Sequence, residues 1–571
     1  MTRLQRMGVW VAGIGITAAA LTALTLATTA TNAATNAATN AATPAAEPRE
    51  TAATGKLPGA GAQQPLKAAA SPPAKLPANL PANPPANPLV NPASGPASRP
   101  SLNPSPGLSS GPTVPPTSAP AAADTGAVTG AVTGAVTGAD TGAVTGAGQR
   151  IYERTRPLLL QVRTLLKTQD SQSSVGSGFV VDSSGLLVTN YHVVSQYALQ
   201  PSRHRLVYAS ADGKQGALEL LAFDVVHDLA LLRPVDPAAL AGRGAVAIRP
   251  ETEPLARGAR IYSLGNPLDV GFAVAEGSYN GQVERNFLDT LFFGGSLSAG
   301  MSGGPALDDQ GRLVGVNVAA RRDGEQVSFL VPAAPVSSLI ARGRSAKPIT
   351  SPAWPEIGRQ LMQHEAALTQ RFIAQPWREA GHPDYRIPVP QETFMRCWGR
   401  GSPQAARGLQ FERSDCEMTS RIFVNNSLLT GFVTVRHETY DGSRIGALRF
   451  ADRYSDSFRN EAIGFDERNR TAAQCVEDTV GVGATGATGA RGAPKDRRAA
   501  ALPLKVVVCL RAYKKLEGLH DLTVLVATLD QTQAGVQGRF DAYGVSLASA
   551  QRLTQHYLDG FAWTAPKTVS R

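Results

Sequence analysis

The sequence predicts an all-β domain of the barrel or sandwich type, followed by an α+β domain and preceded by a long segment without a core. Between residues 149 and 347, short apolar runs alternate with Gly, Asn, Asp and Pro, a pattern typical of many short strands joined by turns. From residue 351 onward, helical and strand-like patterns both occur. Before residue 149, large apolar side chains are too scarce to offset the entropy lost on ordering the chain.

The N-terminal segment has the pattern of an export signal. Arg3 and Arg6 precede an apolar run over residues 7–27, and small residues such as Thr31, Asn32 and Ala33 follow it. This order predicts a secretory signal peptide over residues 1–33. The run is also long enough to remain as an uncleaved membrane anchor. In both cases we expect the bulk of the chain to be exported, to the periplasm or out of the cell.

Residues 34–148 are expected to be a disordered linker. Asn-Ala-Ala-Thr repeats, a Pro/Ala/Asn-rich stretch and Thr-Gly-Ala-Val repeats occur in this region. Proline-rich sequence favours extended backbone, and glycine-rich sequence is flexible. The repeats are far shorter than the helical unit of a solenoid, so we interpret the whole stretch as a spacer.

The charge and the cysteine content exclude several classes of protein. The 571 residues include 55 Lys+Arg and 45 Asp+Glu, a net charge of +10. The basic clusters, at residues 321–322 and 495–498, are short and contain no aromatic residue, so no nucleic-acid partner is expected. Contact with an anionic lipid or polymer of the cell envelope remains an open interpretation of the charge. No second long apolar run follows residue 27, which excludes a polytopic membrane protein.

The elements of the all-β domain, residues 149–347, are expected in the following order. A helix is predicted over residues 151–166. Two turn segments, residues 182–185 and 211–214, each separate two apolar runs and are predicted to close hairpins. Further strands are expected over residues 229–232, 260–264, 313–318 and 327–331.

The α+β domain, residues 351–571, is expected to begin with a helix over residues 355–373. Ser546 is the predicted cap of a final helix, whose apolar face contains Leu547, Ala550, Leu553, Tyr557 and Phe561. Strands are expected over residues 422–424, 431–435, 506–510 and 522–528.

All four cysteines of the chain lie in this second domain. Disulfides persist outside the cytosol, so pairing is expected in an exported protein. Of the possible connectivities we predict Cys397–Cys416 and Cys475–Cys509, because each pair is nearest in sequence. The second bridge would also close the loop that contains a Gly/Ala-rich insert. The alternative is four free, buried thiols.

The segment Gly300-Met301-Ser302-Gly303-Gly304-Pro305 carries the strongest chemical signal. Flanking glycines let the backbone approach a substrate carbonyl and permit dihedral angles that aim two amide groups at one point. A serine needs a general base to become a nucleophile, and the base needs an orienting partner. His192, just after one expected strand, and Asp228, at the start of another, are the upstream candidates.

These segments resemble the trypsin-like serine proteases, and among them the bacterial periplasmic high-temperature-requirement proteases. Three motifs occur in the order of that family. Gly176-Ser177-Gly178-Phe179 with Thr189-Asn190-Tyr191-His192-Val193-Val194 is similar to its histidine motif, and Asp228-Leu229-Ala230-Leu231-Leu232 to its aspartate motif. Gly300-Met301-Ser302-Gly303-Gly304-Pro305-Ala306-Leu307, followed by Gly311-Arg312-Leu313-Val314-Gly315-Val316, is similar to its serine motif. The resemblance implies a chymotrypsin-like double β-barrel, with a catalytic triad in the cleft between the barrels.

The resemblance also implies a role for each site residue. Ser302 would attack the scissile carbonyl, His192 would take and return the proton, and Asp228 would orient the imidazole. The amides of Gly300 and Ser302 would form the oxyanion hole, and no metal or cofactor is required. Position in the fold implies a primary substrate pocket of uncharged residues: Ser296, Leu297, Asn317, Val318 and Ala319. We therefore expect small or medium apolar side chains before the cleaved bond.

The expected function is an exported serine endopeptidase that cleaves protein or peptide substrates through an acyl-enzyme, with an oligomeric state that the sequence does not indicate. The alternative is a catalytically inactive protease-like scaffold in an envelope binding protein whose C-terminal domain binds the target. The relatives often carry PDZ modules after the catalytic domain, but no carboxylate-binding loop of that type is recognisable after residue 345.

Three other interpretations of the motifs are less consistent with the sequence. The serine motif also fits the nucleophile elbow of α/β-hydrolases, but there the serine precedes its Asp and His and a helix follows it. His227 competes with His192 as the base, but the resemblance places the histidine far upstream of the aspartate, so we expect His227 to be a turn residue. Residues 437–441, His-Glu-Thr-Tyr-Asp, differ from the zincin motif at the last position.

Overall fold

The computed structural model describes residues 144–564 apart from residues 321–325, 379, 392, 404–406, 465, 484–500 and 530–531. The expected signal segment, the linker up to residue 143 and the two basic clusters lie outside the described residues. Within the described ranges, no helix combines the length and the apolar character that are needed to cross a bilayer.

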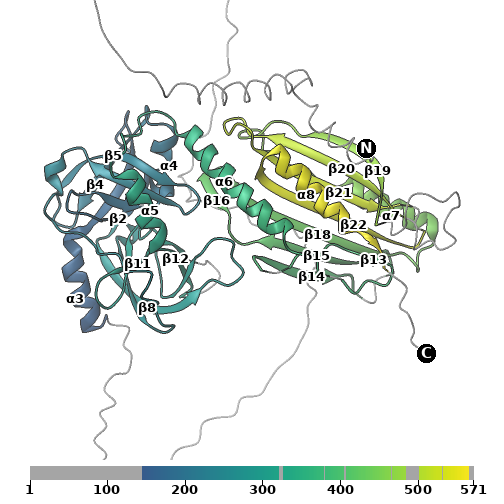
Figure 1. Cartoon of the computed structure of the whole chain (residues 1–571), viewed down its shortest axis with the longest axis horizontal. Coiled ribbons are helices and arrows are strands. Elements are labelled where there is room, and N and C mark those ends of the chain that lie inside the picture. The colour runs from purple at the N-terminus through teal and green to yellow at the C-terminus, as the bar shows by residue number, and fades with distance from the viewer. Residues whose placement is uncertain are drawn as a thin grey trace, which may run out of the picture. The chain divides into compact units, whose positions relative to one another are not determined.

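Two closed antiparallel barrels of six strands each form the first part of the described chain (Figure 1). The first barrel has the strand order β1-β2-β3-β6-β5-β4, with bounds Leu159–Leu166, Gln172–Val180, Leu187–Thr189, His204–Ser210, Gln215–Asp224 and Leu229–Pro234 for β1 to β6. The second has the order β10-β11-β12-β9-β8-β7, with bounds Arg260–Gly265, Ala273–Gln282, Leu291–Gly294, Pro305–Leu307, Leu313–Ala320 and Ser328–Pro332 for β7 to β12. The expected double β-barrel is therefore confirmed.

The turn between β2 and β3 illustrates why the predicted hairpins form. The Asp182 carboxylate accepts hydrogen bonds from the amides of Ser184 and Leu186, at 3.0 and 3.1 Å. Gly185 has φ +87°, a conformation that costs glycine little. The chain thus reverses within residues 182–185, and β2 pairs antiparallel with β3. The second predicted turn, residues 211–214, joins β4 to β5, which also pair antiparallel.

The helix expected over residues 151–166 is wrong in its second half. Helix α3 covers Gly146–Thr155, and the chain from Leu159 to Leu166 is strand β1. Pro157 lies in the short 3-10 turn Arg156–Leu158 between the two; it has no amide hydrogen with which to continue the hydrogen-bond ladder of α3. The first four residues of β1 are all buried, so its apolar run belongs to a barrel wall rather than to a helix face.

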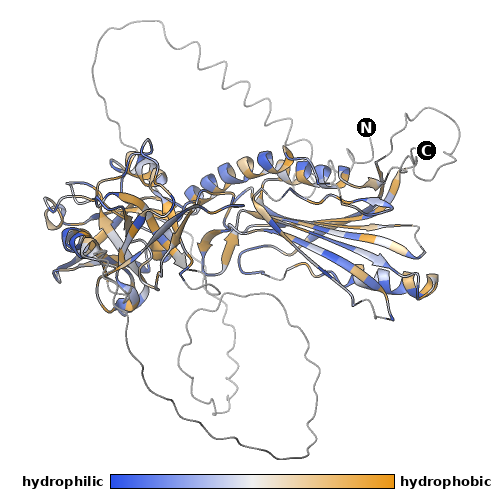
Figure 2. Ribbon diagram, turned by 90° about the horizontal axis from the view of Figure 1, so that it is seen from below, coloured by the Kyte–Doolittle hydropathy of each residue, from blue (hydrophilic) through white to orange (hydrophobic). Residues whose placement is uncertain are grey.

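A seven-stranded antiparallel sheet organises the second part of the chain, in the order β14-β15-β18-β22-β21-β20-β19. These strands cover Met395–Gly401, Gln410–Met418, Phe432–Asp441, Ala534–Val545, His520–Thr528, Leu502–Ala512 and Gln474–Val482, in that order. Two short pairs accompany the sheet: β13 (Tyr385–Arg386) with β23 (Ala562–Trp563), and β16 (Ile422–Asn425) with β17 (Leu428–Thr430). Hydrophobic and hydrophilic residues follow one another along the strands of the large sheet (Figure 2).

Helices cover both faces of this sheet. On one face, α6 (Trp354–Ile373) and α8 (Leu547–Asp559) pack together against β22 (Figure 1), and His437 of β18 stacks on Tyr557 of α8 with ring centroids 5.8 Å apart. On the other face, Tyr440 of β18 meets Tyr454 of α7 (Ala447–Arg459) edge-on at 5.4 Å. The predicted helix over residues 355–373 is confirmed, and so is the Ser546 cap of α8, whose side chain accepts from the amide of Ser549.

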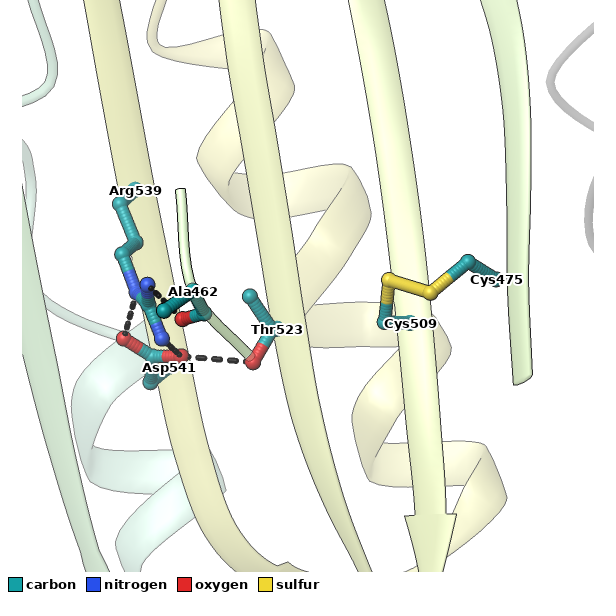
Figure 3. Close-up of a disulfide and its surroundings, with 6 residues drawn as sticks. All are labelled: Ala462, Cys475, Cys509, Thr523, Arg539 and Asp541. Carbon is teal, nitrogen blue, oxygen red and sulfur yellow. Dashed lines mark hydrogen bonds and ion pairs between the residues drawn. A yellow bond between two sulfur atoms is a disulfide. The ribbon is translucent and has the colours of Figure 1, made fainter. Parts of the chain in front are cut away.

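Both predicted disulfides are present, and each joins a strand at one edge of the sheet to the next strand in the order. Cys397 of β14 bonds to Cys416 of β15, and Cys475 of β19 bonds to Cys509 of β20 (Figure 3). In both cases the two residues lie directly opposite each other in the strand register. Beside the second bridge, Asp541 accepts hydrogen bonds from Arg539 and from the Thr523 hydroxyl (Figure 3). The bridges thus fasten the two edge strands to the rest of the sheet.

Removal of either bridge is expected to lower stability without changing the fold. A disulfide restricts the unfolded chain, so each Cys→Ala double variant should lose about 2–4 kcal/mol of unfolding free energy. The Cys475–Cys509 variant should lose about 0.5 kcal/mol more, because its bridge spans 34 residues rather than 19. Urea unfolding of the wild type and both variants, with and without reductant, measures this. Equal midpoints for wild type and variants would contradict the prediction.

Candidate active site

His192 lies in the first turn of helix α4 (Tyr191–Leu199), directly after strand β3. The strand before it was predicted, but the helix was not. The N-cap residue of α4, Asn190, makes no side-chain capping bond. Instead, the backbone carbonyl of Asp228 accepts from the Tyr191 amide at 3.1 Å, and an Asp228 carboxylate oxygen accepts from the His192 amide at 2.8 Å. Asp228 therefore supplies the acceptors that the free amides at this helix terminus need.

The same carboxylate holds the imidazole ring of His192. Oδ2 of Asp228 lies 2.6 Å from Nδ1 of His192. A carboxylate only accepts hydrogen bonds, so Nδ1 carries the proton and Nε2 is left free to accept one. Asp228 has φ +55°, a left-handed conformation that Asp tolerates better than most residues. This conformation, at the turn between β5 and β6, lets one residue bond both the backbone and the ring of His192.

The serine loop, residues 295–304 between β9 and β10, packs against the backbone around His192. The amide of Ser177 in β2 donates to the carbonyl of Ser302 at 2.7 Å. A Cβ placed on Gly303 would lie 2.2 Å from the Ser177 carbonyl oxygen and 2.9 Å from the Asn190 amide nitrogen. Only glycine fits there, and its φ of +85° also favours glycine. The fold therefore brings Ser302 beside the segment that carries His192, although the two are far apart in sequence.

The hydroxyl of Ser302 is turned to the neighbouring strand. Its Oγ donates to the carbonyl oxygen of Val318 in β11 at 2.8 Å, and the described residues show no hydrogen bond from it to His192. Catalytic hydrogen bonds are often absent or long before substrate binds. A rotation about the Cα–Cβ bond of Ser302 moves the hydroxyl without moving the loop.

The three carbonyl groups that precede Ser302 in the serine loop are each held by a hydrogen bond. The oxygen of Ala299 accepts from the Leu268 amide at 2.7 Å, and that of Gly300 accepts from the Ser177 hydroxyl at 2.7 Å. The oxygen of Met301 accepts from Nδ2 of Asn317 at 3.2 Å. Because a trans peptide places its N–H opposite its C=O, the amides of Gly300 and Ser302 point away from these partners. Among the described residues neither amide has an acceptor, as an oxyanion hole requires.

Two residues that fix this loop were not identified as such from the sequence. Ser177 was noted only as part of a motif, and its hydroxyl also accepts from the Asn266 amide at 2.9 Å. Asn317 is fully buried, donates to the carbonyl oxygens of Met301 and Leu264, and accepts from the Ser263 hydroxyl. Asn317 was expected to line the substrate pocket. Its side chain connects the serine loop to β7, with one bond to Met301 and two to Leu264 and Ser263 of that strand.

The other expected pocket residues lie in different environments. Ser296 is exposed, and Leu297 is half-buried against the second barrel's core. Val318 is half-buried and offers its carbonyl to Ser302. Ala319 continues β11, but its side chain lies outside the description. The placement of Ser296, Leu297 and Val318 before and after the serine stays compatible with a pocket of uncharged walls.

The other candidates from the sequence, His227 as the base and residues 437–441 as a metal site, have different surroundings. Nδ1 of His227 lies 3.1 Å from the Asp224 carboxylate, which also binds Arg342 at 3.2 Å. His227 thus sits in the β5–β6 turn, as expected. His437 and Glu438 lie on strand β18 rather than on a helix, so they point to opposite faces of the sheet. No cluster of potential metal ligands occurs among the residues that the structure describes.

The surroundings of His192 favour its protonated form. Burial is the largest influence and disfavours the charged imidazole, but the charge of Asp228 and its hydrogen bond outweigh it together and raise the pKa of His192 above 6.5. Below this pKa the ring is protonated and cannot act as a base. We therefore expect kcat/KM for a peptide substrate to fall as the pH drops, with the midpoint of the acid limb above the ordinary pKa of histidine.

A pH series on a fluorogenic peptide, with buffers of constant ionic strength, measures this limb. A rate that stays constant from about pH 8 to about pH 5, the range in which histidine normally titrates, would contradict His192 as the base.

Comparison with known proteins places all three motifs in one domain. Residues 176–316 match the family model of the trypsin-like peptidase domain. The chain is 26% identical over 223 residues to "Protease Do-like 1, chloroplastic" of Arabidopsis thaliana, covering 35% of this chain and 49% of that one. It is 28% identical over 187 residues to "Serine endoprotease DegS" of Escherichia coli, covering 30% and 46%. The chain thus spans about half the length of these curated relatives.

Among solved structures, a serine endoprotease from Yersinia pestis is 22% identical, with a TM-score of 0.30, covering 35% of this chain and 67% of that one. The family match and the curated relatives show that the chain contains a trypsin-like peptidase domain similar to the high-temperature-requirement and Deg proteases, and the resemblance inferred from the three motifs is confirmed.

Proposed function

We propose that this chain is a serine endopeptidase in which Ser302, His192 and Asp228 form the catalytic triad. The observation that carries the proposal is the pair of bonds from Asp228 to the ring and the backbone of His192, beside a loop in which the carbonyls of Ala299, Gly300 and Met301 are bonded to other segments. The match of residues 176–316 to the trypsin-like peptidase domain supports the same chemistry.

The reaction would begin when the Ser302 hydroxyl turns from Val318 to Nε2 of His192. Oγ attacks the substrate carbonyl carbon, and its proton passes to Nε2, while the amides of Gly300 and Ser302 stabilise the oxyanion. Collapse of the tetrahedral intermediate breaks the peptide bond, and the imidazolium donates its proton to the leaving amine. Water, activated by the same ring, then hydrolyses the acyl-enzyme.

The substrates we propose are proteins or peptides. Proteases among the relatives support a protein substrate, and the uncharged residues on either side of the serine support small or medium apolar side chains before the cleaved bond. Export to the periplasm or beyond the cell is proposed from the pattern of residues 1–33. The two disulfides support it, since such bonds persist in oxidising compartments.

Incubation of the purified chain with casein, followed by mass spectrometry of the products, tests the proposal. We expect endoproteolytic fragments whose new C-termini end in small or apolar residues. An intact substrate after long incubation at pH 8, with the fold verified by circular dichroism, would refute the endopeptidase function.

A further inference from the structure

A hairpin from the C-terminal domain lies beside the catalytic histidine. It consists of β16 and β17, residues 422–430, and it precedes strand β18 of the large sheet. We propose that Phe423 of this hairpin is a positioning residue for His192, so that the C-terminal domain completes the peptidase site. This inference rests on the proposed function, because it needs His192 to act as the base.

The hairpin belongs to the hydrophobic core of the protease barrels. Ile422, Val424 and Leu428 are 2%, 0% and 2% exposed, respectively. They share one continuous apolar core with Tyr191, Val194 and Leu199 of α4. If these side chains separated from this core, the apolar surfaces of the hairpin and of α4 would both be exposed to water, which is unfavourable. The hairpin is therefore fixed against α4 and is not a loop that swings freely.

A hydrogen bond attaches the hairpin directly next to the catalytic residue. The phenol of Tyr191 donates to the carbonyl oxygen of Val424 at 3.2 Å. Tyr191 is fully buried and its ring lies 5.2 Å from that of Phe223 in β5. Tyr191 immediately precedes His192 and Val424 immediately follows Phe423. A shift of the hairpin therefore acts on the residue beside His192.

Strand alternation directs Phe423 to the imidazole. In β16 the side chains of Ile422 and Val424 are buried, while those of Phe423 and Asn425 are half-buried, as the two-residue period of a strand requires. The Phe423 ring meets the His192 ring edge-on, with centroids 6.2 Å apart and planes at 82°. This is a favourable aromatic geometry. It restricts rotation of the imidazole away from Asp228 and shields part of the ring from water.

A buried polar network anchors the other strand of the hairpin. The Thr430 hydroxyl in β17 lies 2.8 Å from that of Tyr513, and the Tyr513 hydroxyl donates to Asp521 at 2.6 Å. Arg470 binds both Asp521 and Tyr513. All four side chains are buried. The hairpin is thus held between the sheet and α4, and Phe423 is presented to His192 in a fixed position.

The effect of Phe423 on His192 can be measured as a shift in the pKa of the imidazole, because the charged groups that act on the ring can be named. Residues 422–430 contain no ionisable side chain. On α4, Tyr191 stays neutral, because burial and then Asp228 raise the pKa of its phenol far above the ordinary value. Asp228 is the charged group that acts on the ring. Phe423 therefore influences the imidazole in two ways. It adds to the burial of the ring, a contribution that lowers the pKa of His192 and opposes the larger combined effect of Asp228, and it restrains the orientation of the ring.

Substitution of Phe423 tests the proposal in the full chain. We expect Phe423→Ala to lower kcat/KM by about 10- to 100-fold, because displaced catalytic groups lose rate steeply. It should also move the acid limb of kcat/KM to higher pH, since the ring becomes more hydrated. Phe423→Leu keeps an apolar cover and should restore most of the rate and the wild-type limb. The matched control is Phe411→Ala in β15, a residue that is 36% exposed and packs near Tyr440, away from the site.

The outcomes separate this inference from the proposed function. A Phe423→Ala enzyme with wild-type kcat/KM, or with lower kcat/KM but an unmoved acid limb, would overturn the positioning role. Thermal unfolding of each variant verifies that the chain is folded. If Ser302→Ala is inactive while Phe423→Ala behaves as wild type, only the role of Phe423 fails. If Ser302→Ala retains full activity, the proposed function fails as well.

Discussion

Replacement of Ser302 by alanine is expected to abolish peptidase activity, with a loss of about 10⁶-fold in kcat as in other serine proteases that lose the nucleophile. The fold should persist, because the hydroxyl makes one bond, to the carbonyl oxygen of Val318, while the loop backbone is held by Ser177, Asn317 and Leu268. Cleavage of a fluorogenic peptide by the purified variant, together with its thermal unfolding curve, measures both expectations.

The matched control for this variant is Ser298→Ala, an exposed serine of the same loop, which should keep the wild-type rate. The double variant of Ser302→Ala with His192→Ala should be no slower than either single variant, since members of a triad act as one unit. A Ser302→Ala enzyme that still cleaves the peptide would show that another residue is the nucleophile.

The second large effect is expected for Asp228→Asn, with a loss of about 10⁴-fold in kcat. The carboxylate accepts from both the amide and Nδ1 of His192. A carboxamide can accept only through its oxygen, so its NH₂ group would face one of these donors or force the ring into the other tautomer. Steady-state kinetics at pH 8 measure the loss.

Asp224→Asn is the matched control, because Asp224 also pairs with a histidine in the same turn. It should lower stability, since its bond to Arg342 is weakened, and leave kcat unchanged. A loss of kcat at Asp224 that equals the loss at Asp228 would indicate a structural effect of the turn rather than a role in orienting His192.

The barrel domain could largely be predicted from the sequence because its signals are local. The turns at residues 182–185 and 211–214 were identified from turn-forming residues between apolar runs, and both hairpins form. The boundary between α3 and β1 was missed, because the apolar run up to Leu166 has no period that separates a helix from a buried strand. Pro157 was the available signal for a break.

The residues of the candidate site differ in how much the sequence indicates about them. His192, Asp228 and Ser302 stand in short motifs, so each could be proposed without knowledge of the fold. The sequence suggested a place for Asn317 in the pocket because it follows Ser302 along the chain. Its side chain is buried, however, and that orientation depends on the pairing of β11 with β12, which the sequence does not give. The contact between Phe423 and His192 joins residues from two domains, and nothing local in the sequence indicates it.

The disulfides were predicted from proximity in sequence, and the structure gives the physical reason. Cys397 and Cys416 lie on adjacent antiparallel strands at one edge of the sheet, and Cys475 and Cys509 at the other. Neighbours in sequence become neighbours in space when a hairpin-like connection joins two strands. The seven-stranded order itself was beyond prediction, because β22 inserts between β18 and β21.

The central claim, that Ser302 is an activated nucleophile, is tested most directly by covalent labelling. A fluorophosphonate probe phosphonylates a serine only where a base and an oxyanion hole activate it. Peptide mapping of the labelled, folded chain should find the adduct on Ser302 and lose it in Ser302→Ala, in His192→Ala and after heat denaturation. A folded wild-type chain that stays unlabelled, or an adduct on another serine, would contradict the account.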